Sequence, residues 1–245
     1  MKLYTQVITV QNESARSTNM HKELEKLRPW CELDVHQFNT PCKNYQGSSD
    51  NNKCVQQNLY ENHQKCAQNI LSTNLPYGLV LESDFLVMYN PDQLSIYMTA
   101  LEQWLTEHNS DFDLFVFGAN HSADKQHAWN NKFICHMVYH AKTHAVIYSR
   151  DFCKNIVKTP WPGSHFDLYW SRHRMDIRAF GFRKMVIGVN SAKHMMEMKS
   201  DYRMNVLNVI LPQIYMTNTV RLSFVALVTI TMFLMFYNAW GFSKR

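Results

Sequence analysis

Short β-prone apolar runs alternate with helix-length amphipathic segments through the first two-thirds of the chain, and this alternation limits the fold more than any other feature. Strands are expected at 3–10, 31–38, 77–81 and 113–118, within 133–148, and at 177–182 and 184–189. Helices are expected at 15–27, 55–71 and 91–105 and after a cap at Ser149, with a polar loop at 40–53. Such alternation predicts one α/β domain with a mostly parallel, doubly wound sheet and helices on both faces.

The charge balance argues against a nucleic-acid partner. The formal net charge is +5, and Arg221, Lys244 and Arg245 flank a C-terminal apolar run without acids, so residues 1–220 carry only 5 − 3 = +2. Phosphate backbones require a stronger basic field. None of the seven glycines falls in a GxGxxG or P-loop pattern. A nucleotide diphosphate would therefore need a divalent metal in place of a glycine-rich loop.

Residues 222–240 form a 19-residue run without a charge. As a helix it would span about 28 Å, close to the hydrocarbon thickness of a bilayer. Basic residues flank the run, and Tyr237 and Trp240 stand where interfacial aromatics occur. A buried core helix is the alternative, but such helices rarely lack a polar face. We expect a domain at 1–200, a juxtamembrane segment at 201–221, a transmembrane helix at 222–240 and a short tail at 241–245.

The first ten residues, MKLYTQVITV, lack the uninterrupted apolar core of a signal peptide. A single-pass membrane protein with a C-terminal anchor and a cytosolic domain is the simplest expectation. The six cysteines include no CxxC pair, which excludes the common structural zinc spacings. In the cytosol all six thiols are expected to be free.

Two carboxylates follow the apolar strand predicted at 77–81. Glu82 and Asp84 stand one residue apart in the sequence GLVLESDF, at the carboxyl end of a strand, where open α/β sheets bind ligands. Their charges repel unless a cation or strong donors lie between them, so they are candidate ligands of a divalent metal. A pair of solvated loop acids is the alternative interpretation.

A second candidate lies in the aromatic-rich segment 160–170. Asp167 stands near His165 just after a Pro/Gly turn, and an Asp beside a His can act as a general base or a metal ligand. A helix-cap Asp among packing aromatics is the alternative. His136, His140 and His144 recur every four residues, but the segment is β-prone and has no HExxH glutamate. We interpret these three histidines as packing or strand-edge residues.

Four stretches, in order, resemble glycosyltransferase family 25, which includes lipooligosaccharide and collagen galactosyltransferases. They are VITVQNESARSTNMHKELEKL, the segment from Cys54 to LPYGLVLESDF, DFDLFVFG, and THAVIYSRDFCKNIV with GSHFDLYW. The resemblance covers about residues 3–190. Ser83 replaces the middle acid of the family motif, Gln57-Asn58 replace a Ser-His pair, and the apolar tail is not a family feature.

The resemblance implies a GT-A fold, with a Rossmann-like sheet that binds a UDP-sugar through an acidic motif and Mn²⁺. It implies an inverting transfer of a hexose, such as galactose or glucose, to the hydroxyl of a glycan or protein acceptor. A catalytically degenerate binding module is the first alternative, and a glycoside hydrolase with two carboxylates is the second.

The resemblance also implies roles for individual residues. Asp84 would bind the metal, and Glu82 would contact it through water or hold the ribose. Asp167 would deprotonate the acceptor, with His165 as a further candidate metal ligand. Two residues at the end of the first strand and the start of its helix would lie near the nucleotide: Gln11 and Arg16.

Overall fold

The computed structural model describes residues 2–10, 14–38, 49–108, 111–118, 120–123, 132–141, 144–163, 169 and 177–189. All of them belong to one compact unit, Met1–Ser191. The predicted juxtamembrane and transmembrane segments, 201–221 and 222–240, lie outside the described residues. Among the residues that are described, no helix is long and apolar enough to cross a membrane.

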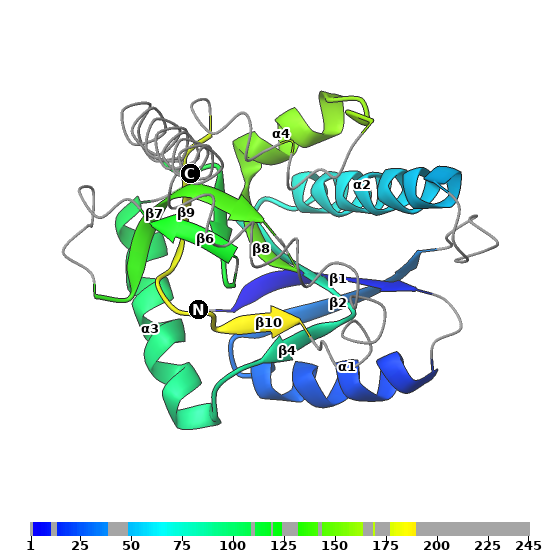
Figure 1. The fold of residues 1–245 in the computed structure, drawn as a ribbon. Helices are drawn as coiled ribbons and strands as arrows, with labels where there is room; N and C mark the ends of the chain where they lie inside the picture. Colours follow the sequence, from blue (N-terminus) through cyan, green and yellow to red (C-terminus); the bar gives the residue numbers. More distant parts are fainter. Residues whose placement is uncertain are drawn as a thin grey trace, which may run out of the picture. The chain divides into compact units, whose positions relative to one another are not determined.

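An eight-stranded sheet forms the centre of this unit, in the order β2-β1-β3-β8-β5-β9-β7-β6 (Figure 1). Its strands in chain order are β1 (Leu3–Val10), β2 (Cys31–Phe38), β3 (Tyr77–Glu82), β5 (Leu114–Val116), β6 (Asn120–Ala123), β7 (Ile134–Ala141), β8 (Ala145–Ser149) and β9 (Ala179–Phe182). β1 and β2 have the predicted bounds, and the prediction of strands within 133–148 is confirmed as β7 and β8. The short strand β6 was not predicted.

Strand direction is mostly parallel. β1 pairs in parallel with β2 and β3, and β5 with β9, whereas β8 is antiparallel to both β3 and β5 and β7 is antiparallel to β6 and β9. Six strands therefore run one way, and β7 and β8 run the other. The reversed β8 in the middle of the sheet departs from a uniformly wound α/β sheet, because alternation of apolar runs does not encode strand direction.

The predicted helices on both faces are confirmed. The helices are α1 (Ser14–Leu27), α2 (Ser49–Ser72), α3 (Pro91–His108) and α4 (Arg150–Lys158). α1 and α3 cover one face of the sheet, and α2 and α4 cover the other (Figure 1). The first two helices contribute leucines and Trp104 to one core, and the other two contribute Ile70 and Phe152 to a second core. Successive residues of β3 supply both cores, since Leu79 and Leu81 belong to the first and Val80 to the second.

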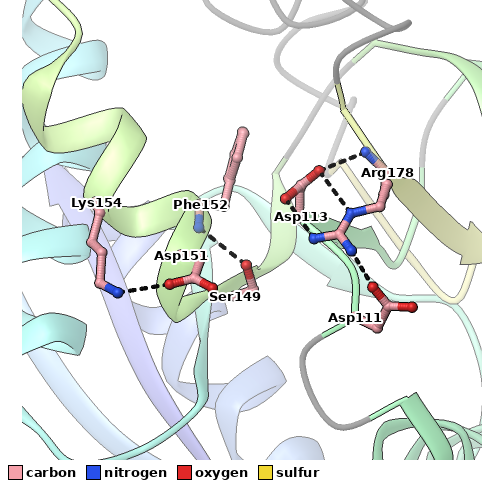
Figure 2. A network of polar contacts seen from close by, with 7 residues as sticks. All are labelled: Asp111, Asp113, Ser149, Asp151, Phe152, Lys154 and Arg178. Atoms are coloured by element: carbon pink, nitrogen blue, oxygen red, sulfur yellow. Dashed lines mark hydrogen bonds and ion pairs between the residues drawn. The ribbon is translucent and has the colours of Figure 1, made fainter.

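The structure confirms the predicted start of one helix and moves the predicted start of another. The predicted cap of α4 is confirmed, since the Phe152 amide donates to Ser149 Oγ at 3.1 Å (Figure 2). α2 begins at Ser49, six residues before the expected start at Val55. The expected loop at 40–53 therefore ends earlier, because the polar residues 49–54 belong to the helix.

A glycine lets α2 approach β3 closely. A Cβ on Gly78 would lie 2.6 Å from Ile70 Cγ1, so a larger residue would require Ile70 to move. A separate two-stranded sheet joins β4 (Phe85–Val87) to β10 (Ile187–Val189), and it begins directly after Asp84. The buried Glu23 of α1 accepts a hydrogen bond from the Val87 amide at 2.8 Å. This bond holds β4, the strand that follows Asp84, against α1.

Candidate metal-binding site

The register of β3 against β8 brings residues 62 positions apart together at the carboxyl end of β3. Leu81 faces Ala145 across this antiparallel pair, so the next residues outward are Glu82 and His144. The Glu82 amide donates to the His144 carbonyl oxygen at 2.9 Å. Because the backbones are joined at this point, the two side chains are held at the same edge of the sheet.

Glu82, Asp84 and His144 form one polar cluster. His144 Nδ1 lies 2.9 Å from Glu82 Oε2 and 3.3 Å from Asp84 Oδ1. The exposed fractions of the three side chains are only 14%, 13% and 18%. Each offers a ligand atom within 4.8 Å of the others. Partial burial strengthens their mutual attraction.

A second imidazole contacts Glu82 from α2. His63 Nε2 lies 3.5 Å from Glu82 Oε1, and the His63 side chain is only 1% exposed. Its other ring nitrogen, Nδ1, lies 2.9 Å from the hydroxyl oxygen of Tyr148 on β8. The two carboxylate oxygens of Glu82 therefore face different histidines, with His144 on one side and His63 on the other.

Electrostatics couple Glu82 to His144. Burial alone would raise the pKa of Glu82, but the charge of His144 and hydrogen bonds from His144 and His63 lower this pKa to about 2. Burial would lower the pKa of His144, but the Glu82 charge and hydrogen bonds to both carboxylates raise it to about 10. At neutral pH the metal-free cluster therefore holds a protonated imidazole between two carboxylates.

The same geometry fits a divalent cation. Neighbouring ligands of an octahedral ion with bonds of about 2.1 Å lie about 3 Å apart. The separations of 2.9 Å and 3.3 Å from His144 Nδ1 to the two carboxylate oxygens are close to that value. Carboxylates suit a hard ion such as Mn²⁺, whereas an imidazole is a more typical ligand of Zn²⁺ or Fe²⁺. The cluster can thus bind either a proton or a metal between its carboxylates.

The sequence contains another pair of acids one residue apart, and the structure gives it a different role. Asp111 and Asp113 lie at the amino end of β5, where both form ion pairs with Arg178 (Figure 2). The Arg178 amide also donates to Asp113 Oδ2 at 2.7 Å. A guanidinium already pairs with both carboxylates, so spacing alone does not make a metal site.

The predicted site residues fare differently. Glu82 and Asp84 lie together in the cluster with His144. Gln11, His165 and Asp167 lie outside the described residues, and Arg16 lies in α1 with its side chain outside the description. Their roles stay predictions.

Two histidines were missed. His144 was interpreted as a packing or strand-edge residue, and it does lie at a strand edge, directly before β8, but its contacts with Glu82 and Asp84 were not anticipated. His136 packs against the ring of Phe180, with 5.4 Å between the ring centroids. His144 directly precedes a buried strand, which is a weak signal for a residue at a sheet edge. Nothing in the sequence around His63 indicated its contact with Glu82.

The cysteines correct one further expectation. Cys54 on α2 is disulfide-bonded, whereas Cys31, Cys66, Cys135 and Cys153 are free and buried. The expectation of six free thiols is therefore wrong.

Comparison with known proteins gives no family. No family model and no curated protein matches the chain. A glycosyltransferase involved in the glycosylation of the major capsid of PBCV-1 superposes with a TM-score of 0.42 at 11% identity, over 72% of this chain and 80% of that one. HddC from Yersinia pseudotuberculosis, complexed with GMP-PN, superposes with a TM-score of 0.41 at 11% identity, over 77% and 94%.

The galactosyltransferase LgtC, in complex with donor and acceptor sugar analogs, superposes with a TM-score of 0.32 at 13% identity, over 71% and 66%. The similar structures thus include glycosyltransferases. Superpositions this loose transfer neither fold family nor function, so any assignment depends on the residues of this chain.

Proposed function

We propose that this protein is a metal-assisted glycosyltransferase that moves a hexose, galactose or glucose, from a UDP-sugar to an acceptor hydroxyl. The observation that carries the proposal is the cluster of Glu82, Asp84 and His144 at the carboxyl end of β3. In α/β sheets this edge is where nucleotides bind. The ordered resemblance to glycosyltransferase family 25 supports the same donor class.

The three clustered side chains would hold the metal. Asp84 and His144 would bind it directly, and Glu82 would bind it through Oε2 while Oε1 faces His63. When bound, Mn²⁺ supplies charge neutralisation for the leaving diphosphate. His144 must give up its Nδ1 proton before it can be a ligand, because the same atom carries the proton in the metal-free cluster.

The remaining proposed roles belong to residues whose side chains the structure does not describe. Asp167 would accept the proton of the attacking acceptor hydroxyl in a single inverting displacement. Gln11 and Arg16 would contact the nucleotide, because they follow β1, the strand beside β3. His165, which neighbours Asp167 in sequence, is a further candidate ligand.

We also propose that residues 222–240 anchor the domain to a membrane as a single helix, with 201–221 lying between them. The acceptor is then a glycan or protein presented at that membrane. The disulfide at Cys54 favours an oxidising compartment over the cytosol for the domain.

Calorimetric titration with UDP, with and without Mn²⁺, tests the proposed donor class. We expect tight UDP binding only when Mn²⁺ is present, followed by slow hydrolysis of UDP-galactose or UDP-glucose in a donor screen. A protein that ignores UDP under both conditions would disprove the proposal and favour a hydrolase. Asp167→Asn should keep UDP affinity while transfer falls by about 10²- to 10⁴-fold.

A second candidate is a catalytically degenerate module that binds glycans or proteins. The position of His144 favours it, because a protonated imidazole between two carboxylates can replace the charge of a metal. Such a module would bind its ligand equally well after chelation of divalent ions. The titration with and without Mn²⁺ therefore separates the two candidates.

A further inference from the structure

A buried chain of polar contacts leads from the core to the far side of the Glu82 carboxylate. Tyr148 and His63 are each 1% exposed and lie among apolar neighbours such as Val80 and Ile70. A buried imidazole and phenol in such surroundings are costly unless they are hydrogen-bonded. The Tyr148 hydroxyl lies 2.9 Å from His63 Nδ1, and His63 Nε2 lies 3.5 Å from Glu82 Oε1.

The packing of α2 on β3 sets this contact. Ile70 of α2 touches Gly78 near the start of β3, and His63 contacts Glu82 at the end of the same strand. Seven helical residues rise about 10 Å and four strand residues about 13 Å, so the two distances nearly match when helix and strand run in opposite directions. The close approach at Gly78 therefore places His63 directly against Glu82.

We propose that His63, held by Tyr148, is a positioning residue that fixes the Glu82 carboxylate so that Oε2 faces the metal site. This inference rests on the proposed metal-binding function. Glu82 Oε1 faces His63 on the core side, and only Oε2 faces His144. Residues that contact a metal ligand and fix its orientation commonly lower the metal affinity when they are replaced.

The chemistry of the two contacts determines which nitrogen of the His63 ring carries the proton. A carboxylate oxygen can only accept, so Nε2 must carry the proton that points towards Glu82. Nδ1 then accepts the hydroxyl hydrogen of Tyr148. Burial raises the pKa of Tyr148 well above its ordinary value, so the phenol keeps its proton. The contact of 3.5 Å between Nε2 and Oε1 is longer than an ordinary N–H···O hydrogen bond and is an electrostatic contact in the metal-free protein.

Calorimetric titration of the full chain with Mn²⁺ alone tests the inference, beside the thermal unfolding temperature of each variant. The variants are His63→Leu, which removes both contacts, His63→Gln, whose amide N–H can still reach Glu82, and Tyr148→Phe. Tyr60→Phe is the matched control, because Tyr60 is an equally buried tyrosine on α2 whose hydroxyl donates to the Thr159 carbonyl at 2.9 Å, away from the site.

We expect Mn²⁺ affinity to fall by about 10- to 100-fold in His63→Leu and by less in Tyr148→Phe, with recovery in His63→Gln. Tyr60→Phe should bind Mn²⁺ like the wild type. The imidazole ¹⁵N signals of His63 should show the Nε2–H tautomer in the metal-free protein and should change in Glu82→Gln.

Unaltered Mn²⁺ affinity in both His63→Leu and Tyr148→Phe, with a wild type that binds, would overturn the positioning role and leave the proposed function standing. If His63→Leu and Tyr148→Phe lose no more Mn²⁺ affinity than Tyr60→Phe does, the positioning role is also overturned, since the effect would then be a general loss of stability. A wild type that does not bind Mn²⁺ would overturn the proposed metal site, and the positioning role with it.

Discussion

Asp84→Asn is the substitution that tests the metal site most directly. It keeps the shape of the side chain and removes one negative charge from a group that is 13% exposed and 3.3 Å from His144 Nδ1. A unit charge pair about 4 Å apart is worth about 4 kcal/mol at an effective dielectric constant of about 20. The Asn oxygen still ligates weakly, and His144 loses its proton more easily, which together return part of that energy.

We therefore expect Asp84→Asn to weaken Mn²⁺ binding by about 100-fold, or about 2.7 kcal/mol. Affinity for UDP with Mn²⁺ should fall in parallel. Asp113→Asn is the matched control, since that carboxylate has the same exposed fraction of 13% but pairs with Arg178. It should bind Mn²⁺ normally.

The assay is calorimetric titration with Mn²⁺, first alone and then with UDP, on proteins whose thermal unfolding has been compared. Wild-type affinity in Asp84→Asn would refute the assignment of the metal site. Equal losses in Asp84→Asn and Asp113→Asn would also refute it, because the effect would then reflect a general change in charge.

Three further predictions concern pH, thiols and the membrane. Because the pKa of Glu82 is lowered to about 2, its ionised carboxylate stabilises the metal-free fold above about pH 4.5, and this contribution is lost as the pH falls towards 2. Because the pKa of His144 is raised to about 10, its protonated ring stabilises the fold below about pH 6.5, and this contribution is lost as the pH rises towards 10. The unfolding temperature should therefore decline on both sides of that interval, and His144→Gln should flatten the alkaline decline; an unchanged alkaline limb would contradict the ion pair. Alkylation of the unfolded, unreduced protein should label four thiols, and six after reduction, because Cys54 is disulfide-bonded; six labels without reductant would count against the bond. Truncation before Arg221 should release a folded domain from membranes, and a truncated protein that resists alkaline carbonate extraction would disprove the anchor at 222–240.

The sequence was most informative where local pattern and local structure coincide. β1 and β2 have their predicted bounds, and the cap of α4 is at Ser149, because alternation, helical period and caps are properties of neighbouring residues. The acid pair at Glu82 and Asp84 was recognisable for the same reason, since both acids directly follow a continuous apolar strand.

Sequence pattern could not separate this acid pair from the one at Asp111 and Asp113. Both have one residue between the acids, and they differ in the partner that the fold supplies, which in each case is 60 or more positions away in the sequence. Arg178 reaches the second pair through the pairing of β5 with β9, and His144 reaches the first through the pairing of β3 with β8. A charge becomes a structural ion pair or a metal ligand according to what the fold places opposite it.

The sequence by itself predicted an α/β domain, the approximate positions of its strands and helices, and two acids at the end of a strand. Only the tertiary structure decided that β8 is reversed beside β3, and this reversal sets His144 against Glu82. Only the packing of α2 at Gly78 decided that His63 contacts the other oxygen of the same carboxylate. Strand register and helix approach are set by long-range burial of apolar surface, which no local run of residues encodes.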